Sequence, residues 1–171
     1  MTMNLALAIV LGVLIMACVS DVTRRRIPNG YSIVIAACFF VASAASPERT
    51  DLVGGLWVAG AVFAVGFLAF AFGKFGGGDV KLMTAMALWA GPAAIMDFLL
   101  VTALAGGGLA LIYLLPPLAF AMTWCRVKAE QAFPVMQAVE IRSNVKTDGI
   151  PYGVAIAAGG AVVLWSRYWS G

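Results

Sequence analysis

The sequence contains no histidine, and charged residues make up only 11% of its 171 residues. Histidine is the commonest metal ligand and the commonest general base, so metal-dependent hydrolysis and Ser-His or Cys-His catalysis become poor hypotheses. Three cysteines, Cys18, Cys38 and Cys125, lie far apart and form no Cys-x-x-Cys pair. We expect them to be packing residues, and we expect neither a metal nor a cofactor.

The chain is too apolar for a water-soluble core, because 63% of its residues are hydrophobic and its mean hydropathy is +0.97. This composition predicts an integral membrane protein in contact with lipid. No soluble appendage or long polar linker stands out, so we expect residues 1–171 to form a single membrane domain. The net charge of +3 does not predict nucleic-acid binding, because the basic residues lie in loops and form no basic face.

Long uncharged runs divide the chain into predicted membrane-spanning helices of about 20 residues. The apolar stretch 82–125 is too long for one crossing, and Gly91-Pro92 supplies a break within it. We therefore predict an all-α bundle of six transmembrane helices with short loops, and an amphipathic segment at the cytoplasmic interface between Trp124 and Asp148. The six predicted helices cover residues 1–20, 27–47, 52–73, 79–90, 93–115 and 149–166.

The distribution of lysine and arginine predicts the orientation of this bundle. With an even number of crossings, nine of the eleven basic residues fall on one side, which the positive-inside rule assigns to the cytoplasm. Both termini are then expected outside. The nine residues are Arg24, Arg25, Arg26, Lys74, Lys81, Arg126, Lys128, Arg142 and Lys146, against Arg49 and Arg167 on the other side.

Two aspartates near the predicted cytoplasmic face are the strongest functional candidates. Asp79 ends the run Gly76-Gly77-Gly78-Asp79 between two apolar stretches, and Asp21 directly follows the first apolar run. Charged residues within a membrane are rare and usually face a wet, functional cavity. Residues 79–90 are only twelve, about 18 Å of helix, so either the helix continues through Pro92 or its N-terminal end begins below the membrane surface. We favour the second, with Asp79 in the membrane at a helix N-terminus, over a plain surface loop.

A pair of carboxylates can hydrolyse a peptide without metal or histidine. Two carboxyl groups a few ångströms apart cannot both ionise cheaply, so they can share a proton. One then accepts a proton from water while the other donates one to the substrate. Glycines before Asp79 would adopt positive φ and allow an extended substrate strand to approach closely.

Other interpretations of the same residues stay open at this point. Asp21 can be an interface residue paired with Arg24 or Arg25, and the glycine triplet can be a plain turn. The pair Asp21 and Asp79 can also serve a small proton-coupled transporter, although the polar candidates cluster on one face rather than at several depths. A non-enzymatic partner in a secretion machine would leave the two aspartates unexplained.

Three motifs together resemble the type IV prepilin peptidase family of membrane aspartic proteases, which carry a Gly-x-Gly-Asp motif. They are Asp21 with Arg26-Ile27-Pro28-Asn29, then Gly76-Gly77-Gly78-Asp79-Val80-Lys81-Leu82, then Pro151-Tyr152-Gly153-Val154-Ala155. Their order and spacing are most similar to the short members that serve tight-adherence (Flp-type) pili. The resemblance implies that Asp21 and Asp79 are catalytic. Substrate-binding or supporting positions are then Gly76, Gly77, Gly78, Lys81, Ile27, Pro28, Asn29, Pro151, Tyr152 and Gly153.

The resemblance also implies a substrate and a location. The substrate would be a prepilin whose short basic leader is cut on the cytoplasmic side of the bacterial inner membrane, just before its apolar helix. Larger members of the family carry a cytoplasmic domain with paired Cys-x-x-Cys motifs and also methylate the new N-terminus. This sequence has neither feature, so we predict a peptidase without methyltransferase activity and without zinc.

Overall fold

The computed structural model describes residues 3–114 and 151–169, and every regular element within them is a helix. The all-α prediction is therefore confirmed for this part of the chain. The amphipathic segment predicted between Trp124 and Asp148, and also Cys125, lie outside the described residues. The helices are α1 (Met3–Arg24), α2 (Asn29–Ala45), α3 (Leu52–Ala71), α4 (Gly77–Leu114) and α6 (Tyr152–Leu164), with a 3₁₀ turn η1 (Pro47–Arg49) and a π-helical end η3 (Trp165–Trp169).

Single residues next to these helices determine where the helices begin and end. Arg25, directly after α1, has φ 51°, a left-handed conformation that turns the chain out of the helix. Pro28 precedes α2 with an extended backbone, which suits a residue that has no N–H to donate. Asp51 caps α3, because its Oδ1 accepts a hydrogen bond of 2.8 Å from the N–H of Gly54.

Helix α4 is divided at Gly91, whose φ of 55° and ψ of −171° are not helical. The first half of α4 runs from its N- to its C-terminus in the same direction as α6. Gly160 lies beside Met86, and beyond the end of α6 the Arg167 guanidinium donates to the carbonyl oxygen of Ala90. Residues 77–90 therefore run parallel to α6.

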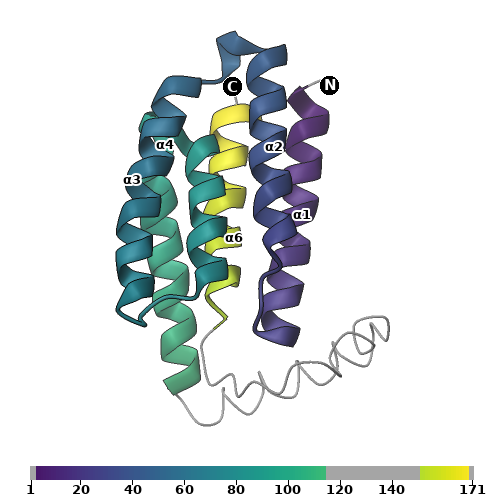
Figure 1. Ribbon diagram of the computed structural model, residues 1–171. Coiled ribbons are helices and arrows are strands. Elements are labelled where there is room, and N and C mark those ends of the chain that lie inside the picture. Colours follow the sequence, from purple (N-terminus) through teal and green to yellow (C-terminus); the bar gives the residue numbers. More distant parts are fainter. Residues whose placement is uncertain (1–2, 115–150, 170–171) are drawn as a thin grey trace.

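The second half of α4 runs the opposite way. Tyr152, at the start of α6, lies against Gly106, while Gly159, further along, lies against Phe98. The chain therefore reverses direction at Gly91-Pro92, and both ends of α4 lie at the same end of the bundle (Figure 1). The break predicted at this dipeptide is present.

The predicted count of six membrane-spanning helices is not supported. Only α1, α3 and α4 are long and apolar enough to cross a membrane by themselves, among the residues that the structure describes. Helix α2 has 17 residues because Pro28 and Pro47 bracket it, and α6 has 13 before its geometry becomes π-helical. The fourth and fifth predicted helices are present as the two halves of α4, which the non-helical residue Gly91 divides.

The core lies between α1, α2, α4 and α6, while α3 covers one side of α4 (Figure 1). Trp89 is fully buried at its centre, and its indole N–H donates to the carbonyl oxygen of Ile35 at 3.1 Å. Its ring makes edge contacts with Phe39 and Tyr168. In α3, by contrast, Trp57 is 78% exposed, as expected for a helix whose outer face meets lipid.

Candidate active site

Asp21 lies in the last turn of α1 and is only 6% exposed. Its Oδ2 accepts a hydrogen bond of 2.6 Å from the backbone N–H of Gly153. Gly153 is in the first turn of α6, where backbone N–H groups have no partner within the helix and attract negative charge. The charge of Arg25 also attracts this carboxylate. The start of α6 therefore fixes the position of Asp21.

Asp79 is the third residue of α4, and its side chain turns back to the start of that helix. The carboxylate lies beside Gly76, directly before α4, because a Cβ on Gly76 would be 2.6 Å from Asp79 Oδ2. Asp79 is half-buried. Each of the two candidate aspartates thus lies against the backbone of one glycine.

The fold brings the two carboxylates to one place. The charge of Asp21 acts on Asp79, so the two groups repel each other when both are ionised. Ile27 links the segments around them. A methyl group on Gly78 would lie 3.1 Å from Ile27 Cβ, and one on Gly153 would lie 2.7 Å from Ile27 Cδ1. Ile27 therefore packs between the start of α4 and the start of α6.

Two glycines at this site leave room for carboxylate oxygens. A Cβ on Gly153 would lie 2.8 Å from Asp21 Oδ2, and a Cβ on Gly76 would lie 2.6 Å from Asp79 Oδ2. Real Cβ atoms do not approach other heavy atoms so closely. A side chain at either position would therefore displace the neighbouring carboxylate.

The predicted reason for the glycine run is wrong in one respect. Gly77 and Gly78 belong to the first turn of α4 rather than to irregular backbone. Among the described glycines only Gly73 and Gly91 have positive φ. The run before Asp79 is thus needed for close approach of neighbouring groups, not for a left-handed backbone.

The remaining predicted positions gather at the same end of the bundle. Lys81 Nζ donates to Asn29 Oδ1 at 3.0 Å, which ties α4 to α2. Pro151 is buried directly before α6, where it accepts at 3.3 Å from the N–H of Val154. Pro28 leads from Ile27 into α2. All three sequence motifs therefore meet in the folded chain.

The sequence reasoning missed one aromatic residue of this site. Phe75 precedes the glycine run, and its ring makes an edge contact with Tyr152, with 5.3 Å between the ring centroids. The contact connects the loop before α4 to the start of α6. An aromatic side chain directly before a glycine run was the available signal, but its partner is 77 positions away in the sequence.

The chemistry of this site is that of two carboxyl groups and backbone N–H donors. Within residues 3–114 and 151–169, no group of three or more His, Cys, Asp or Glu side chains is placed to hold a metal ion. Two carboxyl groups that interact electrostatically can divide the acid and base roles of a hydrolysis between them.

Comparison with known proteins gives one match. A model of the Type IV leader peptidase family matches residues 8–111. This range contains both Asp21 and Asp79 and ends before the Pro151-Tyr152-Gly153 motif. A search of curated proteins and a search of solved structures each returned no match.

Proposed function

Because the chain belongs to the type IV leader peptidase family, we propose that it is a membrane aspartic endopeptidase that removes the short basic leader of prepilins. The observation that supports the proposal is that Asp21, at the end of α1, and Asp79, at the start of α4, lie close enough for the charge of one to act on the other, with Ile27 packed against both Gly78 and Gly153. These residues are 58 positions apart, and both are held at helix ends where a buried acid would otherwise be costly.

The proposed reaction uses the two aspartates as acid and base. One carboxylate takes a proton from a water molecule, whose oxygen attacks the carbonyl carbon of the scissile peptide. The other, protonated carboxyl group delivers its proton to the leaving nitrogen as the C–N bond breaks. The hydrogen bond from the backbone N–H of Gly153 would keep Asp21 oriented throughout.

The glycine-rich backbone beside the carboxylates suits a small residue in the substrate. Gly76, Gly78 and Gly153 line the site, and each is closely approached by a neighbouring side chain. A leader that ends in glycine would fit beside them, whereas a bulky residue would have to displace Ile27. We therefore assign the cut to the position after a glycine and before the apolar helix of the substrate.

We further propose that this site lies near the cytoplasmic face, with both termini outside. Arg24, Arg25, Arg26, Lys74 and Lys81 lie at the Asp21–Asp79 end of the bundle, while Arg49 and Arg167 lie at the other end. The two ends of the described chain lie together, at the opposite end from Asp79 (Figure 1). The reversal of α4 at Gly91 supports separate crossings by its two halves.

Co-expression with a prepilin tests the proposal. Wild-type protein should shorten the prepilin, and the mass of the product should place the cut before the apolar helix without an N-terminal methyl group. Asp21→Asn and Asp79→Asn should each remain in the membrane and leave the prepilin uncut. Asp97→Asn, in the second half of α4, is the matched control and should cleave normally. Normal cleavage by either of the first two variants would refute the proposed roles.

A further inference from the structure

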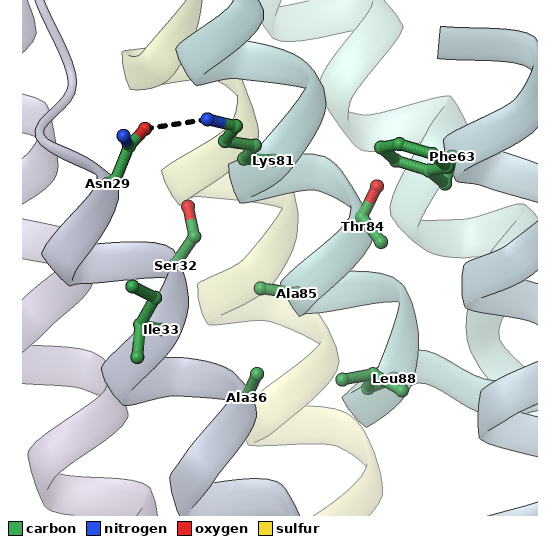
Figure 2. A pocket seen from close by; sticks show the side chains of 9 residues that line it. All are labelled: Asn29, Ser32, Ile33, Ala36, Phe63, Lys81, Thr84, Ala85 and Leu88. Atoms are coloured by element: carbon green, nitrogen blue, oxygen red, sulfur yellow. Dashed lines mark hydrogen bonds between the residues drawn. The ribbon is translucent and has the colours of Figure 1, made fainter. Parts of the chain in front are cut away.

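A groove of about 380 Å³ runs between α2, α3 and the first half of α4. Its walls repeat at helical spacing, because α2 and α4 each contribute residues three, four and seven positions apart. Figure 2 shows these side chains, which are Asn29, Ser32, Ile33 and Ala36 from α2, Lys81, Thr84, Ala85 and Leu88 from α4, and Phe63 from α3.

The groove lies on a different side of α4 from the two aspartates. Lys81 follows Asp79 by two positions, and residues so spaced on a helix do not face each other. Ile33 is 66% exposed and Phe63 46% exposed, so the groove opens toward the surroundings of the bundle. In a membrane those surroundings are lipid.

The mouth of the groove is cationic. Lys81 Nζ and Asn29 Oδ1 bridge it with their 3.0 Å hydrogen bond (Figure 2). Among the residues that the structure describes, Lys81 makes no ion pair, so its positive charge meets only a neutral amide. An ammonium group and an amide N–H₂ group are then both available to an anion.

One turn deeper, a hydroxyl group has no hydrogen-bond partner. Ser32 is 8% exposed, and its Oγ is buried without a partner in the described part of the chain. Figure 2 shows this hydroxyl in the gap between α2 and α4, directed toward the Asn29–Lys81 hydrogen bond. A buried hydroxyl without a partner is destabilising, which points to an acceptor supplied by a ligand.

We propose that this groove binds an anionic phospholipid. Its phosphate accepts hydrogen bonds from Lys81 and Asn29, and an ester carbonyl, about 4.5 Å deeper along α2, accepts from Ser32. The acyl chain lies along Ile33, Ala36 and Leu88. The groove has a cationic mouth and an apolar wall below it. It therefore fits a molecule with an anionic end and an apolar end better than it fits a wholly apolar helix.

Native mass spectrometry of the purified protein tests this assignment without any measurement of peptidase activity. The protein is titrated with phosphatidylglycerol and, separately, with phosphatidylcholine that has the same acyl chains. We expect preferential retention of phosphatidylglycerol, a loss of about fivefold in affinity for Lys81→Ala, and a loss of about threefold for Ser32→Ala. Lys74→Ala is the control, because Lys74 lies at the same end of the bundle but does not line the groove.

Three results would overturn the assignment. They are equal retention of both lipids, unchanged retention by Lys81→Ala, and an equal loss for Lys74→Ala. Ala36→Phe fills the groove from the wall of α2, so it should abolish specific retention while thermal unfolding shows a folded protein. Cross-linking of a prepilin helix, rather than a lipid, to the Ala36→Cys variant would assign the groove to substrate and also contradict the proposal.

Discussion

The substitution Gly153→Ala tests the packing of the candidate active site most sharply. The added methyl group would lie 2.8 Å from Asp21 Oδ2 and 2.7 Å from Ile27 Cδ1. The end of the isoleucine side chain can rotate away. The Asp21 carboxylate cannot do so without losing its 2.6 Å hydrogen bond to the Gly153 N–H.

The expected size of the effect follows from this distance. An ordinary contact begins at 3.4 Å, so the carboxylate has to move by about 0.6 Å, the difference between 3.4 and 2.8 Å. Displacement of a reacting group by about 1 Å costs about 100-fold in rate. We therefore expect leader removal to slow by roughly 10- to 100-fold. The helix itself should not weaken, since alanine favours helix over glycine by about 1 kcal/mol.

The assay measures the cleavage of a co-expressed prepilin over time, and the shift of the product on a gel reports the cleavage. Gly12→Ala is the matched control, because it adds a methyl group to α1 at a position with no other atom within 4 Å. It should cleave at the wild-type rate. The double variant Gly153→Ala/Ile27→Ala separates the two clashes, because it relieves only the contact with Ile27.

Cleavage by Gly153→Ala at the wild-type rate, in a protein of normal abundance, would refute the reasoning. Full recovery in the double variant would show that Ile27, and not Asp21, is the group displaced. Continued slow cleavage in the double variant is the result that we expect.

Three further substitutions test the fold through the apparent free energy of unfolding in detergent. Asp51→Ala removes the cap on Gly54 and should cost about 1 kcal/mol, and Asp51→Ser should recover most of it. Gly91→Ala places a side chain where φ is 55° and should cost about 1–3 kcal/mol, whereas Gly107→Ala should not destabilise. Trp89→Phe removes the indole donor to Ile35, whose carbonyl oxygen keeps its backbone partner within α2, and should cost about 0.5–1.5 kcal/mol; an unchanged stability would mean that this hydrogen bond contributes nothing.

The sequence predicted the helical class and the approximate segments because apolar runs and prolines are local signals. Gly91-Pro92 was recognised as a break, since proline lacks an N–H and restricts the preceding residue. Helix ends were less predictable. The first predicted helix stopped at Ser20, but α1 continues to Arg24, which places Asp21 inside its last turn.

The two candidate aspartates were predicted because a carboxylate beside long apolar runs is costly and therefore conspicuous. The groups that hold these carboxylates in position could not be predicted in the same way. The partner of Asp21 is the backbone N–H of Gly153, 132 positions away, and a backbone donor has no signature in the sequence. The role of the glycines was misjudged for the same reason, since close approach depends on what packs against them.

We propose that Asp21 and Asp79 act as one catalytic unit, and a double-mutant comparison of leader removal can establish whether they do. Rates of prepilin cleavage are measured for Asp21→Asn, Asp79→Asn and the variant that carries both substitutions. Residues that act as a unit are strongly non-additive. We predict that each single variant falls to the background rate and that the double variant is no slower. Measurable cleavage by both single variants, with multiplicative losses in the double variant, would contradict the account.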